Sequence, residues 1–100
     1  NNLHMKNPQE LKLHHIDVLQ AFYNKDYNSV IEKTSWIIYN YHMEFDWLLA
    51  FAYINRGKAY DLLNKRELAK NDYRFVINLD NYFPELNDAE KFIKSPYMIN

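Results

Sequence analysis

Histidines have the widest chemical range among the residues of this sequence, since imidazole binds metals and transfers protons near neutral pH. They stand at positions 4, 14, 15 and 42. No two are four residues apart, the spacing that places two zinc ligands on one helix face. His14 and Asp17 could share a face one helical turn apart, but no third ligand follows, and the chain has no cysteine. We therefore expect no metal site and no cofactor.

Hydroxyl and acidic side chains are no stronger candidates for catalysis. The serines and threonine lie in helical or capping contexts, and none has the Gly-x-Ser-x-Gly spacing of a nucleophile elbow. With a single glycine, the chain cannot build a phosphate-binding loop. Glu44 and Asp46 flank a connection beside His42 like an acid–base cluster, but a helix cap explains Asp46. We expect the isolated chain to be no enzyme.

Composition restricts the fold class and the partners. One hundred residues with 48% hydrophobic side chains fit one small domain. One glycine and three prolines argue against a meander, sandwich or barrel. The formal net charge of −1 gives no field that would recruit nucleic acid or an anionic membrane. The longest apolar run extends from Trp47 to Ile54, far short of a membrane span, so no membrane association is expected.

Capping residues and apolar spacing predict an all-α fold. Asn7, Asp26, Asp46 and Asn64 are the expected N-caps, the last with capping-box spacing to Glu67. Pro84 is expected in the first turn of the last helix, and Ser95-Pro96 should end it. The expected helices cover residues 8–23, 27–41, 47–63, 64–79 and 84–94. Residues 1–7 are predicted to be a disordered or tag-like N-terminus, and residues 95–100 a tail.

The only glycine lies inside a helical pattern rather than in a turn. A glycine within a helix costs about 1 kcal/mol relative to alanine, so it usually has a packing reason. Close approach of a second helix is the reason that we expect. Aromatic residues at helical spacing are expected to pack the helices on one another: Trp36, Tyr39, Tyr53, Tyr60, Tyr73 and Phe75.

The spacing around this glycine resembles the tetratricopeptide repeat signature, an aromatic residue, a glycine and a tyrosine followed by Ala-x-x-x-aromatic. The matching residues are Tyr53, Gly57, Tyr60, Ala69 and Tyr73. The sequence departs from the pattern at Arg56, where leucine is usual, and at Asn81, where proline is usual. The run from Lys25 to Glu32 resembles the turn and second-helix opening of another unit.

Matching Val30 to Ala69 separates the two units by 39 residues, against about 34 in uninterrupted arrays. The first helix matches the third only if the turn after it is one residue shorter. The resemblance implies a domain at 8–94 made of two antiparallel tetratricopeptide-like helical hairpins in a right-handed superhelical fragment. Repeat one would span about 11–42, repeat two about 50–81, and a C-terminal capping helix about 84–94.

The resemblance also implies a function, since the first helices of such pairs line a concave groove that takes a peptide or a partner helix. The residues that would line it are Phe51, Ile54, Asn55, Lys58 and Leu62, with Lys12 and His15 at the far side. Asn55 matches an asparagine of chaperone-binding members, but their other clamp residues are absent here. A module for protein–protein interaction, part of a larger protein or complex, is the predicted function.

Two other functions and one further assembly stay open at this point. The chain could be a non-catalytic accessory domain or pro-domain of an enzyme whose catalytic part lies elsewhere. It could also be a helical repeat that binds nucleic acid through the basic residues between Arg56 and Arg74. Acidic residues interrupt that stretch, so these charges are expected to pair or to face solvent, which disfavours nucleic acid. Association of the chain with itself is a possible assembly.

Overall fold

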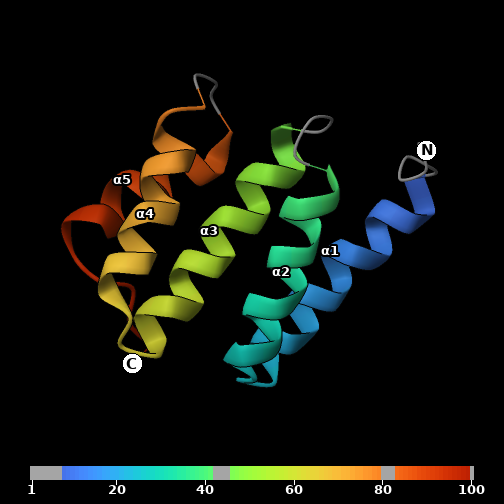
Figure 1. Cartoon of the computed structure of the whole chain (residues 1–100), viewed down its shortest axis with the longest axis horizontal. Helices are drawn as coiled ribbons and strands as arrows, with labels where there is room; N and C mark the ends of the chain where they lie inside the picture. The colour runs from blue at the N-terminus through green and yellow to red at the C-terminus, as the bar shows by residue number, and fades with distance from the viewer. Residues whose placement is uncertain (1–7, 42–45, 80–82, 100) are drawn as a thin grey trace.

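A computed structural model describes residues 8–41, 46–79 and 83–99, and these residues form five helices with no strand among them (Figure 1). The all-α prediction is confirmed. The five lie within one or two residues of their expected bounds. They are α1 (Pro8–Tyr23), α2 (Tyr27–Tyr41), α3 (Asp46–Leu62), α4 (Arg66–Ile77) and α5 (Pro84–Lys94).

The helix ends follow the expected capping chemistry at two places and depart from it at one. The Ser29 amide donates to Oδ1 of Asp26 at 3.2 Å, so Asp26 caps α2 as predicted. Pro84 lies in the first turn of α5. The capping box at Asn64 is wrong: its φ is 61°, and it ends α3 instead of capping α4. Asparagine is one of the few residues that tolerate this left-handed conformation. The side chains of Asn7 and Asp46 lie outside the described part.

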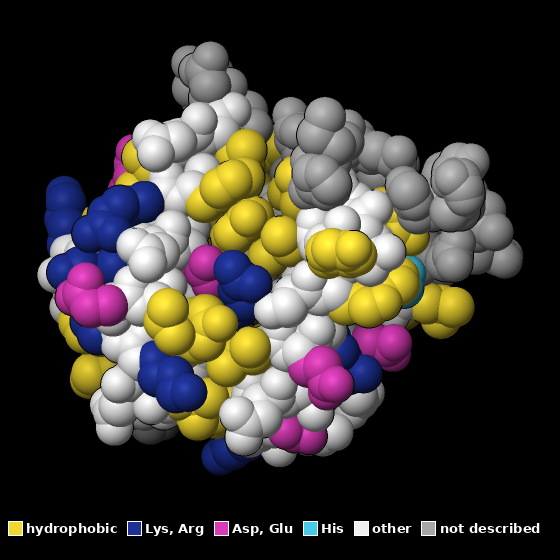
Figure 2. Space-filling view, viewed as in Figure 1, with side chains coloured by type: hydrophobic (Ala, Val, Ile, Leu, Met, Phe, Trp, Pro, Cys, Tyr) yellow, Lys and Arg dark blue, Asp and Glu magenta, His cyan; other side chains and the backbone are white. Residues whose placement is uncertain are grey.

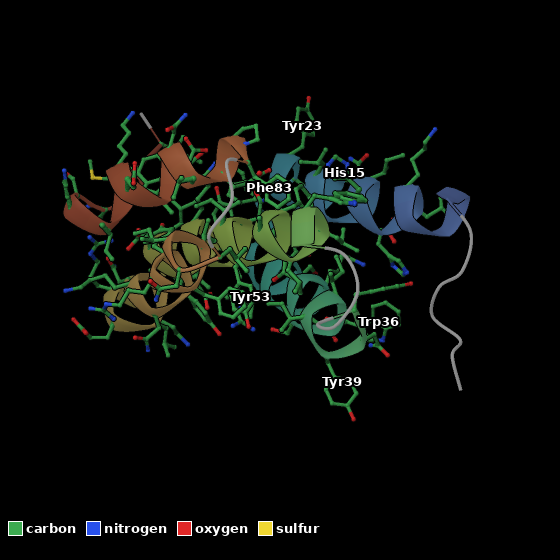
Figure 3. The ribbon with its side chains drawn as sticks, turned by 90° about the horizontal axis from the view of Figure 1, so that it is seen from above. His15, Tyr23, Trp36, Tyr39, Tyr53 and Phe83 are labelled. Carbon is green, nitrogen blue, oxygen red and sulfur yellow. The ribbon has the colours of Figure 1, made fainter. Side chains whose placement is uncertain are left out.

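Helix α3 is the centre of the fold, because it contacts each of the other four helices. Consecutive helices pack on one another along the chain. Figure 3 shows α1 and α5 on one side of α3, and α2 and α4 on the other. Among the described helices, no contact joins α1 or α2 to α4 or α5. Helix α3 therefore links the first two helices to the last two.

The turn between α1 and α2 has the same backbone hydrogen bonds as the turn between α3 and α4. The amide of Asp26 donates to the Ala21 carbonyl at 2.9 Å, and the amide of Lys65 donates to the Tyr60 carbonyl at 2.8 Å. Both donors and both acceptors are 39 residues apart. Each turn also contains one residue with positive φ, Lys25 at 59° and Asn64 at 61°. The two turns therefore have equal length, and the expectation of a shorter first turn is wrong.

Gly57 is buried where α3 meets α4. A Cβ atom at Gly57 would lie 2.5 Å from Cε1 of Tyr73, closer than carbon atoms can approach without a shift. The predicted close approach of a second helix is thus confirmed, and Tyr73 is the residue that fills the space. Val18 and Thr34 occupy the equivalent positions of the first pair, and both are fully buried.

None of the described helices is both long enough and apolar enough to cross a bilayer.

Candidate interaction surfaces

The central residues of the predicted groove lie in the protein interior. Ile54 is 2% exposed and packs in a cluster with Ala69, Tyr73 and Ala89. Phe51 and Asn55 are also buried. Because α1 and α5 contact this part of α3, these side chains contribute mainly to the core. Their role in binding a partner stays a prediction.

The amide of Asn55 is occupied within its own helix. Its Nδ2 donates to the Phe51 carbonyl at 2.9 Å, one turn earlier. In this geometry the side chain satisfies a backbone acceptor of α3. One of the two amide hydrogens that the resemblance would offer to a peptide backbone is therefore already used.

Lys58 reaches α5 and the C-terminal segment. Its Nζ lies 3.4 Å from Oδ2 of Asp88, and 5.7 and 5.1 Å from the ring centroids of Phe92 and Tyr97. Leu62 is half-buried at the end of α3. Ion pairing and cation–π contact hold Lys58 against neighbouring side chains, and leave it little surface for a partner.

The two α1 residues of the predicted site have different surroundings. The ring of His15 stacks on Phe51, with centroids 4.2 Å apart, so the structure joins these two predicted residues. Lys12 is exposed on the same helix. The part of the predicted site on α1 is thus the part that keeps accessible surface.

The segment after α5 crosses from α5 towards α1, a feature that sequence reasoning missed. The Tyr97 amide donates to Oδ2 of Asp61 at 3.0 Å. Its ring makes edge contacts with Phe22 and Phe92, at centroid distances of 6.2 and 5.1 Å. Burial raises the pKa of Tyr97 above its usual value. Pro96 signalled only that the helix ends, and nothing in the sequence indicated where the chain would go next.

Asp61 joins α3, α4 and this C-terminal segment. Besides the Tyr97 amide, it accepts hydrogen bonds from the Tyr73 hydroxyl at 2.7 Å and from Nη1 of Arg66 at 3.0 Å. Arg66 in turn donates to the Ile93 carbonyl at 3.0 Å. Burial, together with the hydrogen bond to Asp61, raises the pKa of Tyr73 far above its usual value. This buried network is satisfied within the chain and therefore has a structural role.

Arg56 is the centre of a second polar cluster, on the α2–α3–α4 side. Its guanidinium donates twice to Asp72, at 2.8 and 2.9 Å, and once to the Ser35 hydroxyl at 3.0 Å. It also lies over the Tyr53 ring, 5.3 Å from the centroid, and that ring stacks on Phe75 at 3.9 Å. Burial raises the pKa of Asp72, and Arg56 opposes the shift. The departure from the repeat signature at Arg56 thus builds an ion pair between helices.

A pocket of about 340 Å³ opens between α1 and α2. The rings of His14 and Trp36 pack against each other there at 4.6 Å. Three charged side chains at the pocket have no ion pair or hydrogen bond with any described residue. The complete lining is His14, Asp17, Glu32, Lys33, Trp36 and Ile37. Within the described ranges, no three histidine, aspartate or glutamate side chains are arranged to hold a metal ion.

The solvent-facing surface of α1, called here the outer face of α1, carries several large apolar side chains. Their exposed fractions are 60% for Leu13, 49% for Ile16, 46% for Leu19 and 83% for Tyr23. The exposed residues of α5, at the other end of the helix order, are Pro84, Asn87, Glu90, Lys91 and Lys94. The two ends of the molecule therefore differ in chemistry.

The expected aromatic packing holds for only part of the set. Tyr73 is fully buried, and Trp36 packs on His14 of α1 although it is 46% exposed, but Tyr39 is 81% exposed, so the prediction is wrong for Tyr39. Figure 3 shows the Trp36 and Tyr39 side chains on the side of α2 and α4, and Tyr39 points away from the described helices. Helical spacing placed them on one face correctly, but whether another element covers that face is a property of the fold.

The basic residues between Arg56 and Arg74 are mostly paired, as expected. Arg56, Lys58, Arg66 and Lys70 each form an ion pair with an acidic residue. Figure 2 shows basic, acidic and hydrophobic side chains interspersed on the viewed face. The viewed face therefore carries no patch of a single charge sign, and nucleic-acid binding stays an untested alternative.

No family model matches the sequence, and neither a curated protein nor a solved structure matches it. The resemblance to the tetratricopeptide repeat therefore rests on the residues of this chain.

Proposed function

We propose that this chain is a protein–protein interaction module of two tetratricopeptide-like hairpins and a closing helix. It binds a protein partner through the outer face of α1, and the contact extends to Lys12 and His15 on the same helix. The observation that carries the proposal is the apolar character of this outer face, on Leu13, Ile16, Leu19 and Tyr23.

Two features support the repeat architecture. The turns within the two helix pairs have matching hydrogen bonds 39 residues apart. Helices α1 and α5 lie on one side of α3, and α2 and α4 lie on the other (Figure 3). In stacked helical arrays each unit contacts its neighbours, and a terminal helix with a polar outer face completes the stack. Helix α5 has that polar face and α1 does not.

An apolar outer face on an end helix favours association. Exposed apolar side chains that gather on one helix face mark interaction sites more often than side chains scattered singly. A partner that covers this face would gain about 25 cal/mol of binding free energy for each Å² of apolar surface buried. The buried groove residues Phe51 and Ile54 offer far less surface.

Paired surface variants test the proposal. Ile16→Lys with Leu19→Lys adds two positive charges to the outer face of α1, where both side chains are about half exposed. Asn87→Lys with Glu90→Gln makes the same change in net charge on the exposed face of α5. We expect both variants to keep the helical circular dichroism spectrum. Affinity capture from cells that express the chain should lose its stoichiometric partner only in the α1 variant.

The same pair of variants tests association of the chain with itself. Light scattering after size exclusion measures the mass of the wild type and of each variant. A dimer that the α1 variant alone converts to a monomer would make a second copy the partner. Equal capture by all three proteins would refute binding through α1.

A further inference from the structure

The pocket between α1 and α2 corresponds residue for residue to a filled cluster between α3 and α4. The separation is 39 residues, the same as between the two turns. The equivalent positions are Tyr53 for His14, Arg56 for Asp17, Asn71 for Glu32, Asp72 for Lys33, Phe75 for Trp36 and Val76 for Ile37. Figure 3 shows Trp36 and Tyr53 on the same side of the molecule, as this equivalence requires.

In the cluster between α3 and α4, a guanidinium fills the space beside two stacked rings. Arg56 lies over Tyr53, which stacks on Phe75. Its Nε and Nη2 atoms each donate a hydrogen bond to the Asp72 carboxylate. An arginine suits this position because the flat cation both stacks on a ring and pairs with a carboxylate through two parallel hydrogen bonds.

The pocket keeps a pair of packed rings but reverses the charges, since Asp17 stands in the place of Arg56 and Lys33 in the place of Asp72. The rings of His14 and Trp36 are tilted by 37° with centroids 4.6 Å apart, whereas those of Tyr53 and Phe75 stack at 3.9 Å. The residue in the place of Arg56 is Asp17, whose shorter side chain leaves the space open and supplies a carboxylate instead. A second carboxylate, that of Glu32 on α2, also lines the pocket. Neither carboxylate has an ion-pair partner among the described residues.

We propose that this pocket takes the guanidinium of an arginine side chain that belongs to the protein partner. The inference rests on the proposed function, since that partner also covers the outer face of α1. The arginine enters between Asp17 and Glu32 and lies against the exposed part of Trp36. The bound cation then meets an aromatic ring and a carboxylate, the same kinds of group that surround Arg56 between α3 and α4.

The neighbourhood of the pocket favours a protein as the source of this cation. Leu13 lies one helical turn from Asp17 on α1 and is 60% exposed, so apolar surface adjoins the acidic rim. A partner segment with an arginine beside apolar side chains matches both features. Divalent metal ions do not match, because no three suitable ligands converge among the described residues.

Titration with acetyl-arginine-amide tests the pocket directly. Amide and indole resonances of the full chain are followed by NMR, with acetyl-citrulline-amide as the uncharged isostere. We expect saturable shifts at His14, Asp17 and Trp36, with a dissociation constant of about 1–10 mM, as for one exposed ion pair and one stacking contact. No saturable shift, or equal shifts with citrulline, would overturn the proposal.

Three single variants test which charged side chains contribute to arginine binding. Asp17→Asn should weaken arginine binding about fivefold or more, because it removes a carboxylate of the rim. Lys33→Gln should tighten binding, because Lys33 is the one cation at the pocket and repels the ligand. Glu90→Gln removes an exposed carboxylate on α5 and should change nothing. An Asp17→Asn affinity equal to that of the wild type would refute the site.

A double variant tests the equivalence of the two clusters. Asp17→Arg with Lys33→Asp installs the pair that Arg56 and Asp72 form. We expect a higher melting temperature and loss of arginine binding, since the new side chain fills the pocket. A lower melting temperature would show that the clusters are not equivalent. These outcomes are independent of partner capture, so arginine binding can fail while the outer face of α1 still binds, and the reverse.

Discussion

The ring of Tyr73 lies directly against Gly57, so that the crossing of α3 and α4 has no space for even one added methyl group. Tyr73 cannot move away freely, because its hydroxyl donates to the buried Asp61 at 2.7 Å. Position 57 therefore combines a helix-destabilising residue with a packing requirement that only this residue meets.

Substitution of Gly57 should destabilise the fold despite better helix propensity. Overpacking costs about 1–3 kcal/mol, whereas replacing glycine by alanine in a helix gains about 1 kcal/mol. We expect Gly57→Ala to lower the free energy of unfolding by about 1 kcal/mol and Gly57→Leu by more, measured by urea denaturation. In a Tyr73→Leu background the cost of Gly57→Ala should shrink, since the ring is gone. An unchanged cost there would place the strain elsewhere.

Tyr73→Phe should change both the stability and its pH dependence. Loss of the hydrogen bond to Asp61 costs about 1.5–3 kcal/mol near neutral pH, because the acceptor is charged. The folded-state pKa of Tyr73 is raised above the usual 10.0, so its contribution is complete below pH 10.0 and is lost as the pH rises further. The difference in unfolding free energy between wild type and variant should therefore be constant up to about pH 9 and narrow between about pH 10 and about pH 11. A difference that stays constant over this whole range would contradict the raised pKa.

The ion pair between Arg56 and Asp72 should be costly to break and cheap to replace. Asp72→Leu alone leaves the guanidinium, which is only 20% exposed, without its counterion, and should cost about 3 kcal/mol. Arg56→Met with Asp72→Leu removes both charges and should leave stability within about 1 kcal/mol of the wild type. Chemical denaturation of both single variants and the double variant measures this coupling. Additive losses would mean that the pair does not act as a unit.

Ile54→Asp and Lys58→Asp should separate core from surface among the predicted groove residues. Ile54 is buried, and a carboxylate there costs several kcal/mol, so the variant should lose its cooperative thermal transition. Lys58→Asp removes an ion pair to an exposed partner and two ring contacts, and should cost about 1 kcal/mol while the fold is kept. Circular dichroism melts distinguish these results. A folded Ile54→Asp protein would indicate that the side chain of residue 54 faces solvent.

The sequence predicted the helices because their ends are coded locally. The Asp26 cap and Pro84 at the start of α5 each act within one turn, so neither depends on tertiary contacts. Asn64 misled because asparagine suits both an N-cap and the left-handed residue that ends a helix. The conformation of the residues on either side of the asparagine decides between those roles.

The surfaces were harder to predict because exposure depends on which elements come together. Helical spacing placed Ile54 on one face of α3, but the residues of α5 that cover it come from a distant part of the sequence. Tyr97 contacts Phe22 across most of the chain length, and no periodicity reports such a contact. The pocket at Asp17 lies between α1 and α2, so it depends on how two helices pack and not on the spacing within either helix.

The difference between the two ends of the helix order determines which symmetry an assembly can adopt. The outer face of α1 is apolar, whereas the exposed residues of α5 are mostly polar or charged, so the ends do not complement each other. Copies that joined end to end would bury charged groups against apolar ones, which disfavours an open filament. Copies that joined through identical α1 faces would be related by a two-fold axis and would stop at two. Self-association of this chain is therefore expected to close rather than to grow.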